Sequence, residues 1–153
     1  LSYIGDGNNV ANSLILCGAL LGVNVRIASP KGFEPKPEIL KKALQIYKNS
    51  NKLFITNDIY QAVKGANVIY TDVWSSMGEE DESELKANQF KGFTLGTQLL
   101  KTAREDAIVL HCLPAYRGKE ITDEVFESKA SRIFQQAENR LHVQQALLAS
   151  ILT

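Results

Sequence analysis

Short apolar runs alternate along the chain with segments whose apolar residues recur at helical spacing. The apolar runs predict strands at residues 1–4, 23–28, 53–56, 67–71 and 107–110, with a sixth short strand at 132–134. The periodic segments predict helices at residues 10–21, 38–49, 59–64, 82–90, 98–105, 123–126 and 138–152. Strands that alternate with helices indicate an α/β fold, a Rossmann-like doubly wound parallel sheet flanked by helices.

The turn after the first strand, residues 5–9, is rich in glycine, aspartate and asparagine, which tolerate unusual backbone angles. A dinucleotide-binding fingerprint would need a third glycine where this chain has Val10, so we reject that interpretation. Asn8 and Asn9 are expected to cap the following helix through one of the two amides. Two amides at a helix start can also donate to a carboxylate, aided by the helix dipole.

In a doubly wound sheet, the loops after the first, fourth and fifth strands gather at one edge. Here those loops are residues 6–9, 72–78 and 111–114, so the unusual chemistry of the chain is expected to converge on one crevice. Asp72 ends an apolar run, where its carboxylate either grips a cation or caps a turn. The acidic run at residues 79–82 is expected to be a solvated surface.

The most distinctive segment is His111-Cys112-Leu113-Pro114, which follows the apolar run at 107–110. Adjacent residues on a strand point to opposite faces, so His111 is not expected to act as the base for a Cys112 nucleophile. The cysteines and histidines of the chain offer no credible zinc ligand set, and we expect neither a metal nor a cofactor. Cys17 is expected in the core, on a helix stripe formed with Val10, Leu14 and Leu21.

Composition restricts the class of protein further. The 153 residues suffice for one ordinary domain, and 17 basic residues balance 17 acidic ones, so nucleic acid and anionic membranes are poor candidate partners. Two cysteines far apart in sequence do not suggest a disulfide framework, and no leader is evident, so we expect a bacterial-type cytoplasmic location. A start at Leu1, already in a strand, suggests a piece cut at a domain boundary.

Taken together, these segments resemble the second, ornithine-binding domain of the ornithine carbamoyltransferase family over residues 1–153. The matching stretches, in order, are Gly5-Asp6-Gly7-Asn8-Asn9, Tyr70-Thr71-Asp72-Val73-Trp74, Ser76-Met77-Gly78, His111-Cys112-Leu113-Pro114 with Arg117-Gly118, Thr122-Asp123-Glu124-Val125 and Ala137-Glu138-Asn139-Arg140. The aspartate branch carries proline where this chain has Cys112, and the acetylated-ornithine branch has a different loop in place of Ser76-Met77-Gly78. A putrescine carbamoyltransferase remains an alternative.

The resemblance implies how the α end of L-ornithine would be held. Asn9 and Asp72, with Ser76 and the backbone of Met77, would bind the α-amino and α-carboxylate groups. The loop around Ser76 would close over the bound amino acid.

The resemblance also implies the roles at the reacting end. Cys112 and the carbonyl of Leu113 would lie beside the δ-amino group, and Arg140 would reach the carbamoyl oxygen. The neutral δ-amine would attack carbamoyl phosphate to give L-citrulline and phosphate, with catalysis by orientation and electrostatics. Cys112 is expected to orient the amine and not to attack the carbamoyl carbon.

The motif with which the family grips phosphate, Ser-x-Arg-Thr-Arg, belongs to its first domain and does not occur in this sequence. We therefore expect an ornithine-binding half that is inactive alone, whose final helix, about residues 138–153, would normally pack on the absent carbamoyl-phosphate domain. The parent enzyme would be a trimer-based homo-oligomer of arginine biosynthesis. Two alternatives are a free-standing amino-acid-sensing domain, and a nicotinamide-dependent domain that Val10 disfavours.

Overall fold

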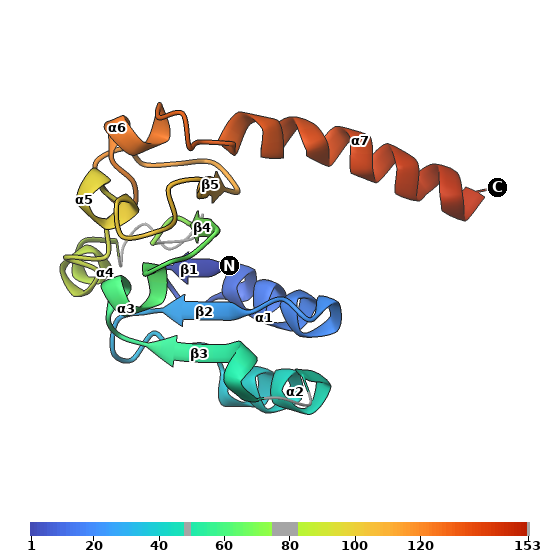
Figure 1. The fold of residues 1–153 in the computed structure, drawn as a ribbon, viewed down its shortest axis with the longest axis horizontal. Helices are drawn as coiled ribbons and strands as arrows, with labels where there is room; N and C mark the ends of the chain where they lie inside the picture. The colour runs from blue at the N-terminus through green and yellow to red at the C-terminus, as the bar shows by residue number, and fades with distance from the viewer. Residues whose placement is uncertain (48–49, 75–82, 153) are drawn as a thin grey trace.

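One parallel sheet organises the molecule. The computed structural model describes residues 1–47, 50–74 and 83–152, and its five strands are hydrogen-bonded in the order β3-β2-β1-β4-β5 (Figure 1). The strands are β1 (Ser2–Ile4), β2 (Val25–Ala28), β3 (Leu53–Thr56), β4 (Val68–Thr71) and β5 (Ile108–His111). All four strand pairings are parallel, which confirms the predicted doubly wound α/β fold.

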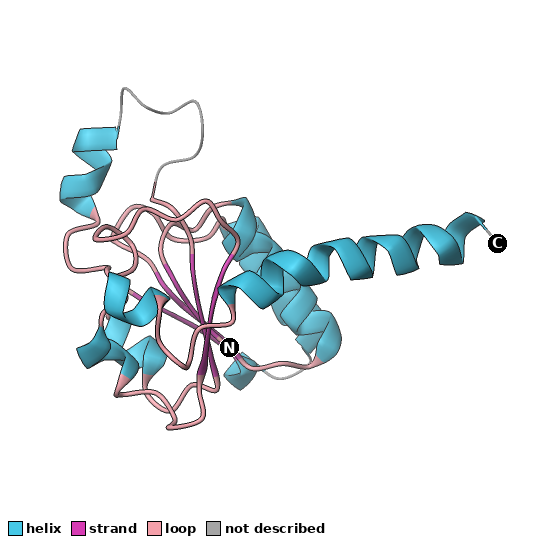
Figure 2. Ribbon diagram, turned by 90° about the horizontal axis from the view of Figure 1, so that it is seen from above, coloured by secondary structure: helices cyan, strands magenta, loops and turns pink. Residues whose placement is uncertain are grey.

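Helices cover both faces of the sheet (Figure 2). They are α1 (Asn9–Leu21), α2 (Pro37–Tyr47), the short 3-10 helix η1 (Ser50–Lys52), α3 (Ile59–Val63), α4 (Ser83–Gln89), α5 (Thr97–Leu100), α6 (Asp123–Phe126) and α7 (Ile133–Leu152). Successive side chains of a strand point to opposite faces of the sheet, so alternate strand residues contribute to two hydrophobic cores, one on each face. Tyr3 packs with α1 and α2, whereas Ile4 packs with α3, α5 and α6.

The face of α1 that meets the sheet differs from the predicted stripe. Cys17 is exposed, and Leu21 is 79% exposed, so the expectation that Cys17 lies in the core is wrong. The buried positions are instead Ala11, Ile15, Gly18 and Ala19, of which all but Ile15 are small. A Cβ atom at Gly18 would collide with a methyl group of Val25, so α1 lies close to β2 through the side of the helix that lacks bulk.

Several element boundaries also differ from the sequence prediction. No strand forms at residues 132–134: Ser131 makes a single bridge to Val109, and the helix begins at once, at Ile133. The segment Glu138-Asn139-Arg140 therefore lies inside α7 and does not open it. α5 ends at Leu100, because the chain turns there and the Arg104 N–H donates to the Ala66 carbonyl. β5 continues to His111, one residue beyond the predicted end.

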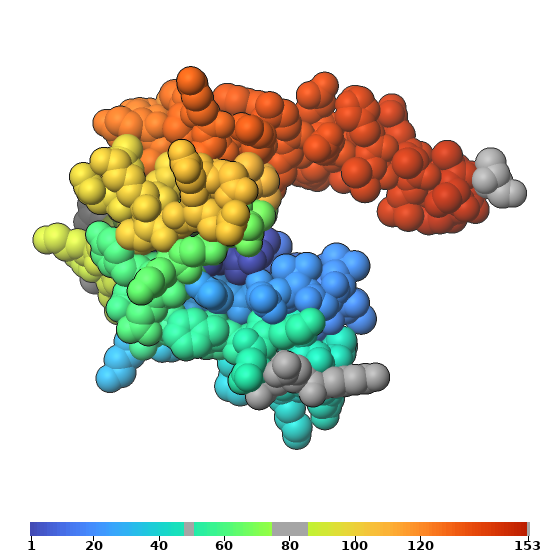
Figure 3. Space-filling view, in the orientation of Figure 1, coloured from blue at the N-terminus to red at the C-terminus, as the bar shows by residue number. Residues whose placement is uncertain are grey.

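α7 projects from the body of the molecule (Figures 1 and 3). Its first residue, Ile133, is fully buried, but every residue described from 137 to 152 is exposed, including Leu148 at 58% and Ile151 at 69%. Among the described residues, no helix is both long and apolar enough to cross a membrane.

Candidate functional site

The carboxyl ends of β1, β4 and β5 meet at one edge of the sheet. β1 pairs with β4 through Ile4 and Thr71, and β4 pairs with β5 through Thr71 and His111. The turn after β1, the residue after β4 and the segment after β5 are therefore neighbours, which confirms the predicted convergence for residues 6–9, 72–74 and 111–114. Each of these segments contributes a polar side chain to the cluster described next.

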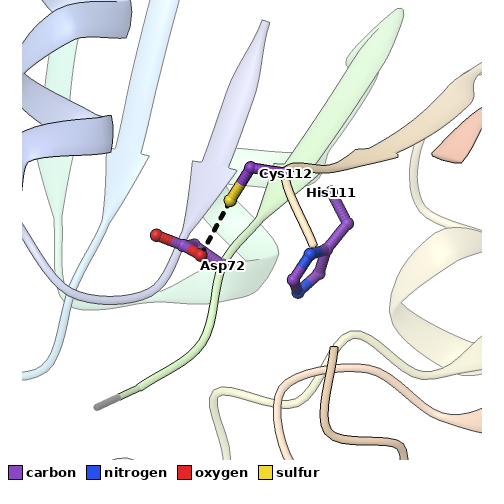
Figure 4. A group of neighbouring side chains, drawn as sticks. All are labelled: Asp72, His111 and Cys112. Carbon is purple, nitrogen blue, oxygen red and sulfur yellow. Dashed lines mark hydrogen bonds between the residues drawn. The ribbon is translucent and has the colours of Figure 1, made fainter. Parts of the chain in front are cut away.

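Asp72 is the centre of this cluster. It is only 5% exposed, and its Oδ1 accepts hydrogen bonds from the Cys112 thiol at 2.9 Å and from the Val73 N–H at 2.8 Å (Figure 4). Its Oδ2 accepts a bond from the Asn8 side-chain amide at 3.2 Å. The oxygen of that amide accepts from the N–H groups of Val10 and Ala11, so Asn8 both caps α1 and holds the carboxylate.

The groups around Asp72 are held in their protonated forms. Burial, and next the hydrogen bond to Asp72, raise the pKa of Cys112 to about 12. Burial and the charge of Asp72 raise the pKa of Tyr3 well above its ordinary value, and burial raises the pKa of Tyr70 as well. Neutral pH therefore leaves Cys112 as a thiol, which favours donation to Asp72 over nucleophilic attack.

The His111 and Cys112 side chains leave the chain in different directions, and a His111 ring nitrogen lies within 4.8 Å of the Cys112 sulfur (Figure 4). His111 is 1% exposed, and its ring lies 3.3 Å from a carboxylate oxygen of Glu120, which is also fully buried. Its backbone N–H donates to the Oε1 atom of Gln136, whose Nε2 donates to the Tyr70 hydroxyl. Gln136 thus ties the start of α7 to both β4 and β5.

Asp72, His111 and Cys112 bring three potential metal-ligand atoms within 4.8 Å of one another. The potential ligand atoms of these residues already have protein partners. The Asp72 oxygens accept hydrogen bonds from Asn8 and Cys112, and the His111 ring nitrogens face the Leu113 N–H and Glu120. A metal ion would have to break these bonds, so the arrangement is that of a hydrogen-bonded network.

The other predicted site residues are distributed around this edge. Asn9 is the first residue of α1 and is exposed, beside Asn8. Leu113 is partly buried, with a positive φ of 57° and a cis bond to Pro114. Arg140 is exposed on α7, one helical turn beyond Gln136. Ser76 and Met77 lie outside the described residues.

Three parts of this network were not expected from the sequence. The sequence allowed Asn8 to cap the helix or to donate to a carboxylate, but it did not identify Asp72 as the acceptor. Gln136 and the buried Glu120 were not singled out. Residues 115–120 look like an ordinary charged loop, and no local pattern marks Glu120 as buried. An amide at the start of a helix is equally inconspicuous.

Comparison with known proteins agrees with this geometry. Residues 1–151 match the model of the Aspartate/ornithine carbamoyltransferase, Asp/Orn binding domain. The chain is 70% identical over 153 residues to an ornithine carbamoyltransferase of Prochlorococcus marinus (strain MIT 9312). The alignment covers all of this chain and 50% of that protein. It is 57% identical over 152 residues to an ornithine carbamoyltransferase of Nostoc sp. (strain PCC 7120), with coverage of 99% and 50%.

Solved structures give the same result. The ornithine carbamoyltransferase from Pyrococcus furiosus superposes with a TM-score of 0.90 at 48% identity, over 97% of this chain and 48% of that one. The anabolic enzyme from Campylobacter jejuni gives a TM-score of 0.91 at 44% identity, over 97% and 49%. The chain spans about half the length of the curated relatives it matches. It therefore belongs to the aspartate/ornithine carbamoyltransferase family, in which it corresponds to the Asp/Orn-binding domain.

Proposed function

We propose that this chain is the ornithine-binding half of an ornithine carbamoyltransferase, which converts carbamoyl phosphate and L-ornithine to L-citrulline and phosphate. The observation that carries the proposal is the Asp72 carboxylate, held between Asn8 and Cys112 at the meeting point of three strand ends. It is a nearly buried anion surrounded by neutral donors, which suits a ligand that brings an ammonium group.

The α end of ornithine is assigned to Asp72 and Asn9, together with Ser76 and the backbone of Met77. Asp72 offers a carboxylate for the α-ammonium group. Asn9 lies exposed at the start of α1, where an amide and the positive end of the helix dipole favour the α-carboxylate.

The reacting end is assigned to Cys112, Leu113 and Arg140. The thiol and the Leu113 carbonyl orient the neutral δ-amine, which forms a C–N bond to the carbamoyl carbon as the C–O bond to phosphate breaks. The released phosphate takes up the proton that the amine loses. Arg140 supplies a guanidinium to the carbamoyl oxygen, which gains negative charge during the attack. No covalent intermediate on Cys112 is required. The raised pKa of the Cys112 thiol supports a role in orienting the amine rather than in nucleophilic attack.

The carbamoyl-phosphate site is assigned to a second half that this chain does not supply. The whole enzyme would be a trimer-based homo-oligomer serving arginine biosynthesis in the bacterial cytoplasm. The final helix, from about residue 138, would pack on that second half, and the exposure of its apolar side chains supports this assignment.

Complementation tests the proposal. The chain replaces the matching half of the Prochlorococcus marinus MIT 9312 relative, and citrulline formation is measured for this chimera and for the 153-residue chain alone. We expect citrulline only from the chimera. A folded chimera without activity, or citrulline from the chain alone, contradicts the proposal, and a trapped carbamoyl group on Cys112 contradicts the role given to the thiol.

Ligand choice is tested on the active chimera by initial rates with L-ornithine and putrescine, and by norvaline inhibition. Asp72 and Asn9 recognise an α-amino acid, so ornithine should be the better substrate and norvaline a competitive inhibitor. Equal use of putrescine would assign the chain to the diamine-specific branch. Binding of ornithine without any transfer would instead favour an amino-acid sensor.

A further inference from the structure

Leu113, which follows Cys112, has an unusual backbone conformation. Its φ of 57° lies in the left-handed region, which residues other than glycine seldom occupy. Such a conformation persists only where the surroundings hold it. The carbonyl of Leu113 is the group assigned to the δ-amine, so whatever holds this residue also aims that carbonyl.

The His111 ring makes the contact that holds Leu113. The Leu113 N–H donates to Nδ1 of His111 at 2.9 Å. Because Nδ1 accepts a hydrogen bond, the proton of the neutral ring is on Nε2. Nε2 lies 3.3 Å from the Oε1 atom of Glu120, toward which it donates.

Glu120 fixes the far end of the same loop. Its Oε1 atom also accepts a hydrogen bond from the Tyr116 N–H, and its own carbonyl accepts from the Leu95 N–H at 2.8 Å. The side chains of His111 and Glu120 are both about 1% exposed or less. The two side chains therefore bind two backbone N–H groups of one loop, at Leu113 and at Tyr116, out of reach of solvent.

We propose that His111 is a positioning residue that locks Leu113 in the conformation needed to present its carbonyl to the substrate amine, and that Glu120 holds the His111 ring in the orientation that this requires. Both ring nitrogens of His111 are directed at protein partners, Nδ1 at the Leu113 N–H and Nε2 at Glu120, so we assign the ring to the loop and not to the substrate. The proposal rests on the function proposed above for Leu113. It assigns the decisive role to the acceptor at Nδ1, whereas a purely structural role would depend on both ring nitrogens alike.

Two substitutions separate the nitrogens. His111→Asn places an amide oxygen near the position of Nδ1, so it keeps an acceptor for the Leu113 N–H but loses the contact with Glu120. His111→Gln places an amide near the position of Nε2, so it keeps a donor for Glu120 but loses the acceptor for the Leu113 N–H. Both are made in the active chimera, and kcat, KM for ornithine and the urea midpoint are measured.

We expect His111→Asn to keep kcat/KM for ornithine within about threefold of the parent, and His111→Gln to lower it at least about tenfold, at similar urea midpoints. Activity losses that simply follow the urea midpoints in both variants would overturn the proposal. If the parent chimera makes no citrulline, the proposed function fails, and the following measurement still tests the lock.

That measurement uses the 153-residue chain without ligand. The chain has two histidines, His111 and His142, so their imidazole nitrogen resonances can be assigned in a labelled sample. We expect His111 to be protonated at Nε2, with a scalar coupling between Nδ1 and the Leu113 amide across the hydrogen bond. A proton on Nδ1 at neutral pH would overturn the proposal even if both variants fail to fold.

Discussion

At the scale of single residues, the chemistry of the site depends on one anion and its neutral neighbours. Asp72 accepts hydrogen bonds from Cys112, Asn8 and Val73, while Tyr3 and Tyr70 stay protonated beside it. The network concentrates a single negative charge where three segments meet. An ammonium group can therefore pair with the Asp72 carboxylate, because the neighbouring thiol and phenols are neutral.

The protonated state of Cys112 can be checked by alkylation in a Cys17→Ser background. A cysteine reacts with alkylating agents as the thiolate. Because the pKa of Cys112 is raised to about 12, its thiolate forms only when the pH rises far above neutrality. At about pH 8.5, iodoacetamide should modify Cys112 at least tenfold more slowly in the folded chain than in urea. Asp72→Asn should speed the folded reaction, because removing the charge lowers the thiol pKa.

Gly7 illustrates a backbone constraint at the same scale. A Cβ atom there would meet backbone atoms of Phe33, Glu34 and Pro35, which cannot rotate out of the way. The Gly7 N–H also donates to the Phe33 carbonyl at 2.7 Å. Gly7→Ala should lower the free energy of unfolding by about 1–3 kcal/mol, measured by urea denaturation.

Gly96→Ala is the matched control for that substitution. A Cβ atom at Gly96 would meet only a methyl group of Thr122, at an ordinary contact distance of 3.5 Å, and the backbone there has a negative φ of −108°. We expect a change within about 0.5 kcal/mol. Equal losses at Gly7 and Gly96 would contradict the steric explanation.

At the scale of elements, the side-chain amide of Gln136 joins α7 to both β4 and β5. Gln136 accepts from the His111 N–H at 3.0 Å and donates to the Tyr70 hydroxyl at 2.9 Å. Because α7 is otherwise buried only at Ile133, this amide sets where the helix leaves the sheet and hence where Arg140 lies. The position of Arg140, to which we assign the carbamoyl oxygen, is therefore linked to a residue four positions earlier in the same helix.

Gln136→Ala should leave both partners unsatisfied and lower the free energy of unfolding by about 1–3 kcal/mol. The amide of His111 should also lose protection against hydrogen exchange. Gln135→Ala removes an exposed amide from the adjacent position and should change the free energy of unfolding by less than about 0.5 kcal/mol. Unchanged exchange at His111 in Gln136→Ala would show that the amide is dispensable.

At the scale of the whole molecule, α7 contributes little to the stability of the domain beyond its first turn. Its residues from 137 onward are exposed, including Leu141, Leu147 and Leu152. A long helix with apolar side chains on solvent-facing positions gains its packing from outside the domain. In the proposed enzyme, the second half supplies that packing.

Truncation after Arg140 tests this description. Removing residues 141–153 should change the free energy of unfolding by less than about 0.5 kcal/mol, because the residues described from 141 to 152 are all exposed. Ile133→Ala, which empties a fully buried position at the start of the same helix, should cost about 2–5 kcal/mol. A large loss on truncation would show that outer α7 packs on the domain in solution.

The sequence by itself determined the alternation of strands and helices, and with it the parallel sheet and the edge where residues 6–9, Asp72 and Cys112 meet. These features depend on short-range periodicity and on the handedness of crossovers. A helix cap from one of the two asparagines, Asn8 and Asn9, likewise follows from local sequence, and the structure assigns it to Asn8.

Only the tertiary structure decided which side of α1 is buried, because the close approach of α1 to β2 requires a residue without a side chain at Gly18. It also decided that Asn8 reaches Asp72, that Gln136 joins α7 to Tyr70, and that Glu120 is buried against His111. These contacts join residues that are distant in sequence or opposed across a loop. Such pairs leave no periodic signal, since a polar side chain destined for a buried hydrogen bond looks in sequence like one destined for water.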